Sequence, residues 1–341
     1  MTNDERRILF VHNGQERFVR DDFDILAESY RVTDCYQPRR WFNPIRLYQE
    51  VARCDLIFCW FASWHALAPV LLAKALGKPS VVVVGGYDTA NVPAAGYGAQ
   101  RGGLPRFVAR TVIRHATKLV VISQSARNEV ISSVGADPDK ISVIYPGVRP
   151  LPMGPLEREP IALTVGNVWR ENLLRKGLLP FVQAAAYLPD VRFVLVGRWC
   201  DDSINELKAI ATPNVEFTGF VSDAELVGWY QRASVYVQAS LHEGFGLSVA
   251  EAMTAGCIPV VSRVGALPEV VGETGYCFDS GEPVEIAGTV AQILVSEPAR
   301  RLVCRKRVQS SFPMERRGQA LQTLLAGIPG GFRNLPGDLH W

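Results

Sequence analysis

The strongest constraint on the fold is the alternation of short apolar runs with helical patterns along nearly the whole chain. Six candidate strands lie in each half: RILFVHN, YRVTDCY, DLIFCWF, SVVVVGG, KLVVIS and ISVIYPG, then IALTVGN, VRFVLVG, VEFTGFV, VYVQAS, PVVSR and GYCFDS. Apolar strands separated by helices are typical of parallel sheets that helices cover on both faces. The pattern therefore predicts an α/β protein with two doubly wound domains of similar architecture.

The segment YPGVRPLPMGPLEREP, residues 145–160, separates the two halves. It carries five prolines and no apolar periodicity, which is typical of a linker. We therefore expect domains at 1–150 and 151–311, and a C-terminal helix at about 312–326 that packs back on the first domain. Because open parallel sheets bind ligands beyond the carboxyl ends of their strands, two facing sheets would form a cleft for the active site.

Charge and cysteine usage exclude several classes of protein. The net charge of +2 provides no overall field for nucleic acid. Seven scattered cysteines without a CxxC pair argue against a disulfide framework and against a zinc site. The N-terminal segment MTNDERRILFV lacks the features of a signal peptide, so we expect a cytoplasmic protein. The uncharged segment 56–72 is interpreted as a strand followed by a helix rather than as a membrane span.

The stretch LHEGFGLSVAEAMTAG, residues 241–256, carries the clearest chemistry. Gly244, Phe245 and Gly246 form a loop before a helix that begins near Leu247, and the free N–H groups of a helix N-terminus favour phosphate. Helical side chains lean toward the N-terminus, so Glu251 can reach the same place and accept hydrogen bonds from a ribose diol. Glu243 could hold another hydroxylated group. The alternative is that both glutamates are solvated surface acids.

The segment HEGFGLSVAEAMTAGCIPVVSRVGALPEVV resembles the donor-site signature of glycosyltransferase family 4, in which seven residues separate two glutamates. That resemblance implies a GT-B fold, with two Rossmann-like domains facing across a cleft. It also implies a retaining enzyme that moves a hexose from a nucleotide-diphosphate sugar to a hydroxyl acceptor, which is a glycan, a lipid-linked or a small molecule. The first domain would bind the acceptor, and the second would bind the donor without a metal or another cofactor.

The resemblance also assigns roles to single residues. Glu243 would orient the donor sugar as a catalytic residue, Lys176 would contact the diphosphate, and Glu251 would bind the ribose. The remaining donor-binding positions belong to the loop, the helix start and two strand ends: His242, Gly244, Phe245, Gly246, Leu247, Ser248, Gly197 and Val221.

The chain departs from the family pattern at three places. Asn167 stands where the family's diphosphate-binding arginine is usual, so either Arg170 or Arg175 would replace it, and Arg170 is slightly favoured. Gly85 stands at the place of a histidine near the donor sugar, whereas Asp88 matches the acid that follows and is predicted to be catalytic. A glycine-rich loop that family members carry is missing after the first strand, so the resemblance says least about how the acceptor is recognised.

Arg106, Arg110 and Arg114 recur every four residues on a predicted helix. This basic stripe is interpreted either as a solvated face or as a contact with an anionic membrane or a phosphorylated lipid acceptor. The second interpretation predicts a peripheral position at the inner membrane surface. Two alternatives to a transferase stay open. One is a nucleotide-sugar epimerase or hydrolase of the same fold, and the other is a noncatalytic sugar-nucleotide sensor.

Overall fold

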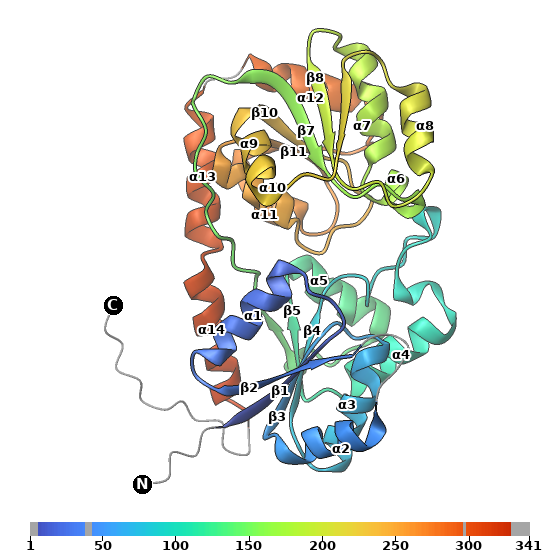
Figure 1. Cartoon of the computed structure of the whole chain (residues 1–341), viewed down its shortest axis with the longest axis vertical. Helices are drawn as coiled ribbons and strands as arrows, with labels where there is room; N and C mark the ends of the chain where they lie inside the picture. The colour runs from blue at the N-terminus through green and yellow to red at the C-terminus, as the bar shows by residue number, and fades with distance from the viewer. Residues whose placement is uncertain (1–5, 38–42, 296–297, 329–341) are drawn as a thin grey trace. The chain divides into compact units, whose positions relative to one another are not determined.

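The computed structural model describes residues 6–37, 43–295 and 298–328, which divide into two compact units (Figure 1). The first unit contains the chain up to Asn91, Gly98–Gly147 and the chain from Met314 onward. The second unit contains Val148–Pro313 together with the short segment Val92–Tyr97. The chain therefore passes between the units several times, and one of these passages lies in the proline-rich segment 145–160.

The first unit is built on a parallel sheet with the strand order β2-β1-β3-β4-β5-β6. Its strands are β1 (Arg7–His12), β2 (Arg31–Tyr36), β3 (Leu56–Trp60), β4 (Ser80–Val84), β5 (Lys118–Val121) and β6 (Ile141–Val143). The apolar strands β3 and β4 are buried along their whole length, as expected where helices cover both faces. The edge strand β2 is mostly exposed, which leaves polar side chains accessible there.

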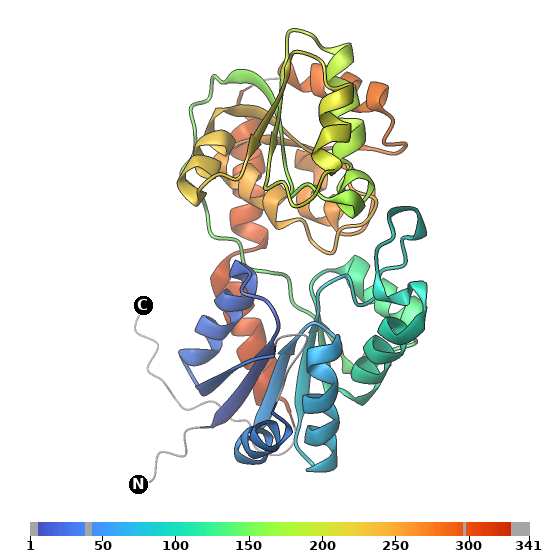
Figure 2. The same ribbon diagram turned by 45° about the vertical axis from the view of Figure 1, so that its right-hand side comes forward.

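Helices lie on both faces of this sheet. They are α1 (Arg17–Ala27), α2 (Pro44–Arg53), α3 (Trp64–Ala75), α4 (Gly103–His115), α5 (Gln124–Glu129) and α14 (Met314–Ala326). Helices α1 and α14 pack together on one face, whereas α3 packs with α2 and α4 on the other. In the turned view, blue α1 and red α14 lie on the opposite side of the sheet from α3 and α4 (Figure 2).

A buried ion pair attaches α14 to the first unit. The guanidinium of Arg317 donates to both carboxylate oxygens of Asp22 on α1, at 2.5 and 2.6 Å, and to the carbonyls of Ile144 and Tyr145. Asp22 also accepts a hydrogen bond of 2.9 Å from the indole of Trp60. Because these donors satisfy the buried carboxylate, the C-terminal helix is fixed against α1.

The second unit repeats the architecture with the strand order β12-β11-β10-β7-β8-β9. Its strands are β7 (Glu159–Val165), β8 (Arg192–Val196), β9 (Val215–Gly219), β10 (Ala233–Gln238), β11 (Ile258–Ser262) and β12 (Tyr276–Phe278). Its helices are α6 (Arg170–Arg175), α7 (Leu178–Ala184), α8 (Ser203–Ile210), α9 (Asp223–Arg232), α10 (Leu247–Ala255), α11 (Leu267–Val271), α12 (Pro283–Leu294) and α13 (Arg300–Ser311). Helix α7 packs with α8 and α12, and α10 packs with α9, α11 and α13.

The prediction of two doubly wound α/β folds is confirmed, since each of the twelve predicted strands overlaps an observed one. The uncharged segment 56–72 contains β3 and the first part of α3, as predicted. Within the described ranges, the structure contains no helix with the length and apolar character needed to cross a membrane.

Candidate functional site

The strand order of the second unit indicates where its ligand site lies. From β7 the chain winds outward through β8 and β9, and from β10 it winds the other way through β11 and β12. Open parallel sheets bind ligands beyond the carboxyl ends of the strands at such a reversal. The two loops at this point are 166–177 after β7 and 239–246 after β10. They contain Lys176 and Glu243, two of the residues that the sequence singled out.

A close backbone approach holds these two loops together. Gly177 has a φ of +68°, and a β-carbon at this position would collide with the carbonyl of Ala239. The N–H of Leu241 donates a hydrogen bond of 2.9 Å to the carbonyl of Arg175. Glycine at position 177 therefore allows the α6–α7 turn to lie against the end of β10, which places Lys176 beside Glu243.

Lys176 and Glu243 form an ion pair with 2.5 Å between Nζ and Oε2. Their side chains are 18% and 14% exposed. Burial alone would raise the pKa of Glu243, but the charge and the hydrogen bond of Lys176, helped by Arg175 and His242, hold this pKa below its usual value. Buried ion pairs contribute little net stability, so a pair at a ligand-binding position indicates function.

Arg175 brings a second cation to this cluster. Its guanidinium carbon lies 4.6 Å from the centroid of the Tyr97 ring, and that ring lies 5.8 Å from the imidazole of His242. The buried amide oxygen of Asn172 accepts hydrogen bonds of 2.9 and 2.6 Å from Arg175, which fixes the guanidinium. Adjacent cations on a rigid turn suit a ligand with two negative charges.

Arg170, which the sequence favoured for the diphosphate, lies elsewhere. Its guanidinium pairs with Glu206 on α8, and its backbone N–H donates to Asp201 at 2.9 Å. The Arg170 side chain is 68% exposed. The geometry therefore favours Arg175 over Arg170, because α6 turns the side chain of Arg170 away from the Lys176–Glu243 pair while Arg175 lies next to it.

The loop after β10 leads into the N-terminus of α10. Gly246 has a φ of +97°, and α10 begins at Leu247, followed by the half-buried Ser248. Among the described residues, no side chain caps this helix, so its first N–H groups are available to an anion. The carbonyl of Glu243 accepts a hydrogen bond of 3.1 Å from the N–H of Ala266, which holds the loop from the β11 side.

Two predicted donor-binding side chains have other neighbours. The ring of Phe245 is buried against Phe312, with 5.1 Å between the centroids, so only the main chain of Phe245 remains for a ligand. Glu251 lies in the second turn of α10, where its Oε2 is 3.5 Å from the hydroxyl of Tyr230. The long distance leaves most of the acceptor capacity of this carboxylate unused by Tyr230.

Gly197 and Val221 lie at the ends of β8 and β9. A β-carbon at Gly197 would collide with the carbonyl of Gly166, which explains the glycine. Val221 is half-buried and follows Phe220, whose ring is 68% exposed. The guanidinium carbon of Arg198 lies 5.0 Å from that ring's centroid. This edge therefore offers an exposed aromatic face and a cation beside the backbone near Val221.

Asp88 lies in the first unit and is 1% exposed. Its Oδ2 accepts a hydrogen bond of 2.8 Å from the N–H of Gly85. Burial raises the pKa of Asp88 to about 6, against the opposing effect of the Gly85 N–H. A carboxyl group enclosed in this way orders the loop after β4, and its predicted catalytic role stays a prediction.

Phe61 explains the glycine at position 85. A β-carbon on Gly85 would collide with the Phe61 ring, so that ring occupies the space of any side chain at position 85. Phe61 follows β3 with a φ of +69°, and in the part of the chain that the structure describes it is the single non-glycine residue with a positive φ. Backbone strain of this kind is concentrated at functional sites.

Sequence reasoning missed Tyr97 and Asn172. Tyr97 reaches the cluster because Val92–Tyr97 belongs to the second unit although its neighbours in sequence belong to the first, and no local pattern marks such a passage. Asn172 is a buried amide on a short helix, and its hydrogen bonds give no periodic signal. No group of three or more histidine, cysteine, aspartate or glutamate residues that could hold a metal ion occurs within residues 6–37, 43–295 and 298–328.

Comparisons with known proteins match both halves of the chain. A model for "Glycosyltransferase Family 4" matches residues 6–150, and a model for "Glycosyl transferases group 1" matches residues 159–296. O-antigen chain mannosyltransferase B of Escherichia coli is 28% identical over 205 residues, which are 55% of this chain and 54% of that protein. D-inositol 3-phosphate glycosyltransferase of Mycolicibacterium vanbaalenii is 28% identical over 215 residues, 55% of this chain and 48% of that protein. The matched region thus spans about half the length of these relatives.

Solved structures agree with this assignment at the level of the fold. The crystal structure of Anabaena HepE in complex with UDP and glucose superposes with a TM-score of 0.77 at 17% identity, over 95% of this chain and 100% of that chain. Sucrose-phosphate synthase from Thermosynechococcus elongatus gives 0.72 at 19% identity, over 94% and 98% of the two chains. The two family models follow each other in the expected order and each covers one doubly wound sheet, and the chain therefore belongs to the family 4 glycosyltransferases, with their GT-B fold.

Proposed function

We propose that this protein transfers a sugar from a nucleotide-diphosphate sugar to a hydroxyl acceptor, with retention of the anomeric configuration. The observation that carries the proposal is the buried Lys176–Glu243 pair at the carboxyl ends of β7 and β10, beside the open N-terminus of α10. The relatives support the donor class, since their names describe mannosyl and other glycosyl transfer, and HepE was crystallised with UDP-glucose.

Different residues at this site would bind different parts of the donor. Lys176 and Arg175 would neutralise the diphosphate together with the N–H groups of α10, and this positive charge would stabilise the nucleoside diphosphate as it leaves. Glu251 would accept hydrogen bonds from the two ribose hydroxyls. Glu243, which Lys176 keeps ionised, would accept hydrogen bonds from the sugar and hold its anomeric carbon in place.

We also propose that these cations replace a metal ion. Two side-chain cations and a helix terminus supply the positive charge that a divalent ion would supply to a leaving diphosphate. Turnover in the presence of a chelator should therefore equal turnover with added Mg²⁺. A requirement for Mg²⁺ would contradict this part of the proposal.

The test of the function is a panel of labelled UDP, GDP and ADP sugars, each incubated with the intact chain with and without simple glycosides and polyols as acceptors. Release of the nucleotide that depends on an acceptor indicates a transferase. Release or isomerisation without an acceptor indicates a hydrolase or an epimerase, and tight binding without turnover indicates a sensor. The anomeric configuration of the product, read by NMR, tests retention.

A membrane contact is a separate proposal, and the structure changes the residues that would make it. Arg110 is directed inward, because its guanidinium donates to Gln100 at 3.0 Å and to the carbonyl of Ser133 at 2.5 Å. Arg106 and Arg114 are exposed, and Leu104 and Phe107 of the same helix are 65% and 64% exposed.

Charge supports an anionic lipid surface as the partner of this helix. The chain contains no aspartate or glutamate between Asp88 and Glu129, so nothing in that segment offsets its arginines. Exposed apolar side chains flanked by cations are typical of helices that lie on anionic membranes. Flotation with vesicles of phosphatidylglycerol and phosphatidylcholine should recover the protein, and Leu104→Ser with Phe107→Ser should abolish recovery. Equal recovery with pure phosphatidylcholine would contradict the proposal.

A further inference from the structure

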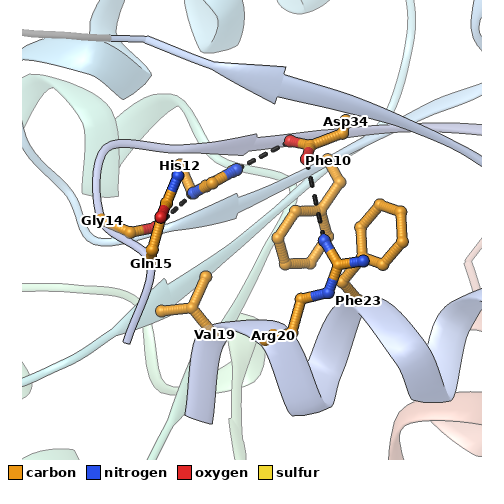
Figure 3. Close-up of a pocket in the computed structure, with 8 residues that line it drawn as sticks. All are labelled: Phe10, His12, Gly14, Gln15, Val19, Arg20, Phe23 and Asp34. Carbon is orange, nitrogen blue, oxygen red and sulfur yellow. Dashed lines mark hydrogen bonds and ion pairs between the residues drawn. The ribbon is translucent and has the colours of Figure 1, made fainter. Parts of the chain in front are cut away.

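A cavity of about 330 Å³ lies in the first unit, between α1 and the edge strand β2 (Figure 3). It is lined by Phe10, His12, Gly14, Gln15, Val19, Arg20, Phe23 and Asp34. This volume is at the lower end of the range for small-molecule sites. The cavity adjoins the carboxyl end of β1, the side of a parallel sheet on which ligands bind.

A buried imidazole forms the fixed part of this cavity. His12 is 7% exposed, and its ring is held between the carbonyl of Gly14, 2.5 Å from Nδ1, and Oδ1 of Asp34, 2.7 Å from Nε2 (Figure 3). The side chain of Asp34 is 44% exposed. A carboxylate has about four acceptor positions, so the contact with His12 leaves most of them available to a ligand.

Arg20 faces the same carboxylate across a gap. Its NH1 lies 3.9 Å from Oδ2 of Asp34, which is too long for a hydrogen bond, and its guanidinium carbon lies 4.5 Å from the centroid of the Phe23 ring. Phe10 packs edge-on against Phe23, with 5.4 Å between the centroids. The cavity therefore joins a carboxylate and a guanidinium, set slightly apart, to an aromatic wall.

This combination of groups selects the chemical class of the ligand. The carboxylate of Asp34 repels an anion, and the guanidinium of Arg20 repels a cation. A neutral hydroxyl group suits both, because it donates to the carboxylate and accepts from the guanidinium. The aromatic wall suits the apolar C–H face of a ring. We propose that this cavity binds a neutral polyol, namely a sugar ring of the acceptor. The role of the cavity as an acceptor site rests on the proposed function, whereas the binding of a polyol does not.

The experiment is a titration of the intact chain, without donor, with methyl α-D-mannopyranoside, methyl α-D-glucopyranoside and myo-inositol, followed by NMR. At least one should bind with a Kd of roughly 1–10 mM, the affinity that a neutral ligand of about a dozen heavy atoms reaches. Asp34→Asn and Arg20→Gln should each weaken binding at least tenfold. Arg31→Gln is the matched control, because Arg31 is exposed at the start of β2 and does not line the cavity.

Inorganic phosphate is titrated in parallel. Binding of phosphate without binding of any polyol, or polyol binding that Asp34→Asn leaves unchanged, would overturn the inference. Circular dichroism of each variant shows that the fold is kept, and His12→Gln provides a second test if Asp34→Asn unfolds. Nucleotide affinity is measured on the same samples. If the unaltered chain binds a nucleotide but no polyol, only this inference is contradicted. If the unaltered chain neither binds a nucleotide nor shows turnover, the proposed function is contradicted.

Discussion

Lys176→Met is expected to destabilise the second unit by about 3–5 kcal/mol at pH 7.5, the usual effect of removing one partner from a buried ion pair. Lys176 and Glu243 are 2.5 Å apart, and both side chains are more than four-fifths buried. Removal of the ammonium leaves a buried, ionised carboxylate without its hydrogen-bonded counter-charge. Glu243→Gln in the same chain should recover most of this loss, because a neutral amide needs no counter-charge.

The destabilisation should depend on pH in a defined direction. In the unaltered chain the pKa of Glu243 is below its usual value, so the pair contributes stability at neutral pH that is lost as pH falls through that lowered pKa. In Lys176→Met the charges of Arg175 and His242 still lower the pKa of Glu243, but Lys176, the strongest influence that opposes burial, is gone, so this pKa should be higher than in the parent. The difference in unfolding free energy between variant and parent should therefore be largest at pH 7.5 and smaller at pH 5, where the carboxyl takes up a proton.

Native-state hydrogen exchange at the β10 amides is the suitable assay, because it reports the second unit separately from the first. Arg263→Met is the matched control in the same unit. Arg263 and Asp279 are 2.7 Å apart, but their side chains are 56% and 72% exposed, so this substitution should destabilise the second unit far less than Lys176→Met does. A loss below about 1 kcal/mol in Lys176→Met, or no recovery by Glu243→Gln, would refute the reasoning.

Further predictions concern both units. Burial raises the pKa of Asp88 to about 6, so the folded state binds this proton more tightly than the unfolded state, and the first unit should lose about 2 kcal/mol between pH 4 and pH 7. Exchange at the β4 amides should show this loss in the parent and not in Asp88→Asn. Gly85→Ala should destabilise the first unit, and Phe61→Gly in the same chain should restore it; equal melting temperatures for parent and Gly85→Ala would count against the steric account. Glu251→Gln should weaken nucleotide affinity by about tenfold through the loss of charge-assisted hydrogen bonds, whereas Glu243→Gln should chiefly lower turnover. Calorimetry that finds unchanged nucleotide affinity in Glu251→Gln would contradict this division of roles.

The fold could be predicted from the sequence because its signal is local. Each strand is a short apolar run, and the strand-to-helix alternation leaves few possible topologies. Lys176 and Glu243 were both assigned to the donor site from the resemblance to the family, but their ion pair was not predicted. The glycine turns around Gly246 gave the same indication, because small residues mark a close backbone approach.

The remaining site residues depend on long-range packing that no spacing records. Tyr97 joins the cluster only because a short segment of the first half belongs to the second unit. The sequence slightly favoured Arg170 over Arg175 as the cation for the diphosphate, and only the orientation of α6 in the structure reverses this preference. Phe245 was assigned to the donor from its place in a motif, but its partner Phe312 lies far along the chain.

The central claim is that the second unit binds a nucleotide-diphosphate sugar at the Lys176–Glu243 pair and that the protein transfers the sugar. Isothermal titration of the intact chain with UDP, GDP and ADP tests it most directly, followed by turnover with the corresponding sugars. The account predicts saturable binding of at least one nucleotide diphosphate, weakened at least tenfold in Lys176→Met and unchanged in Arg263→Met. Absence of binding to all three nucleotides, or equal affinity in both variants, would contradict it.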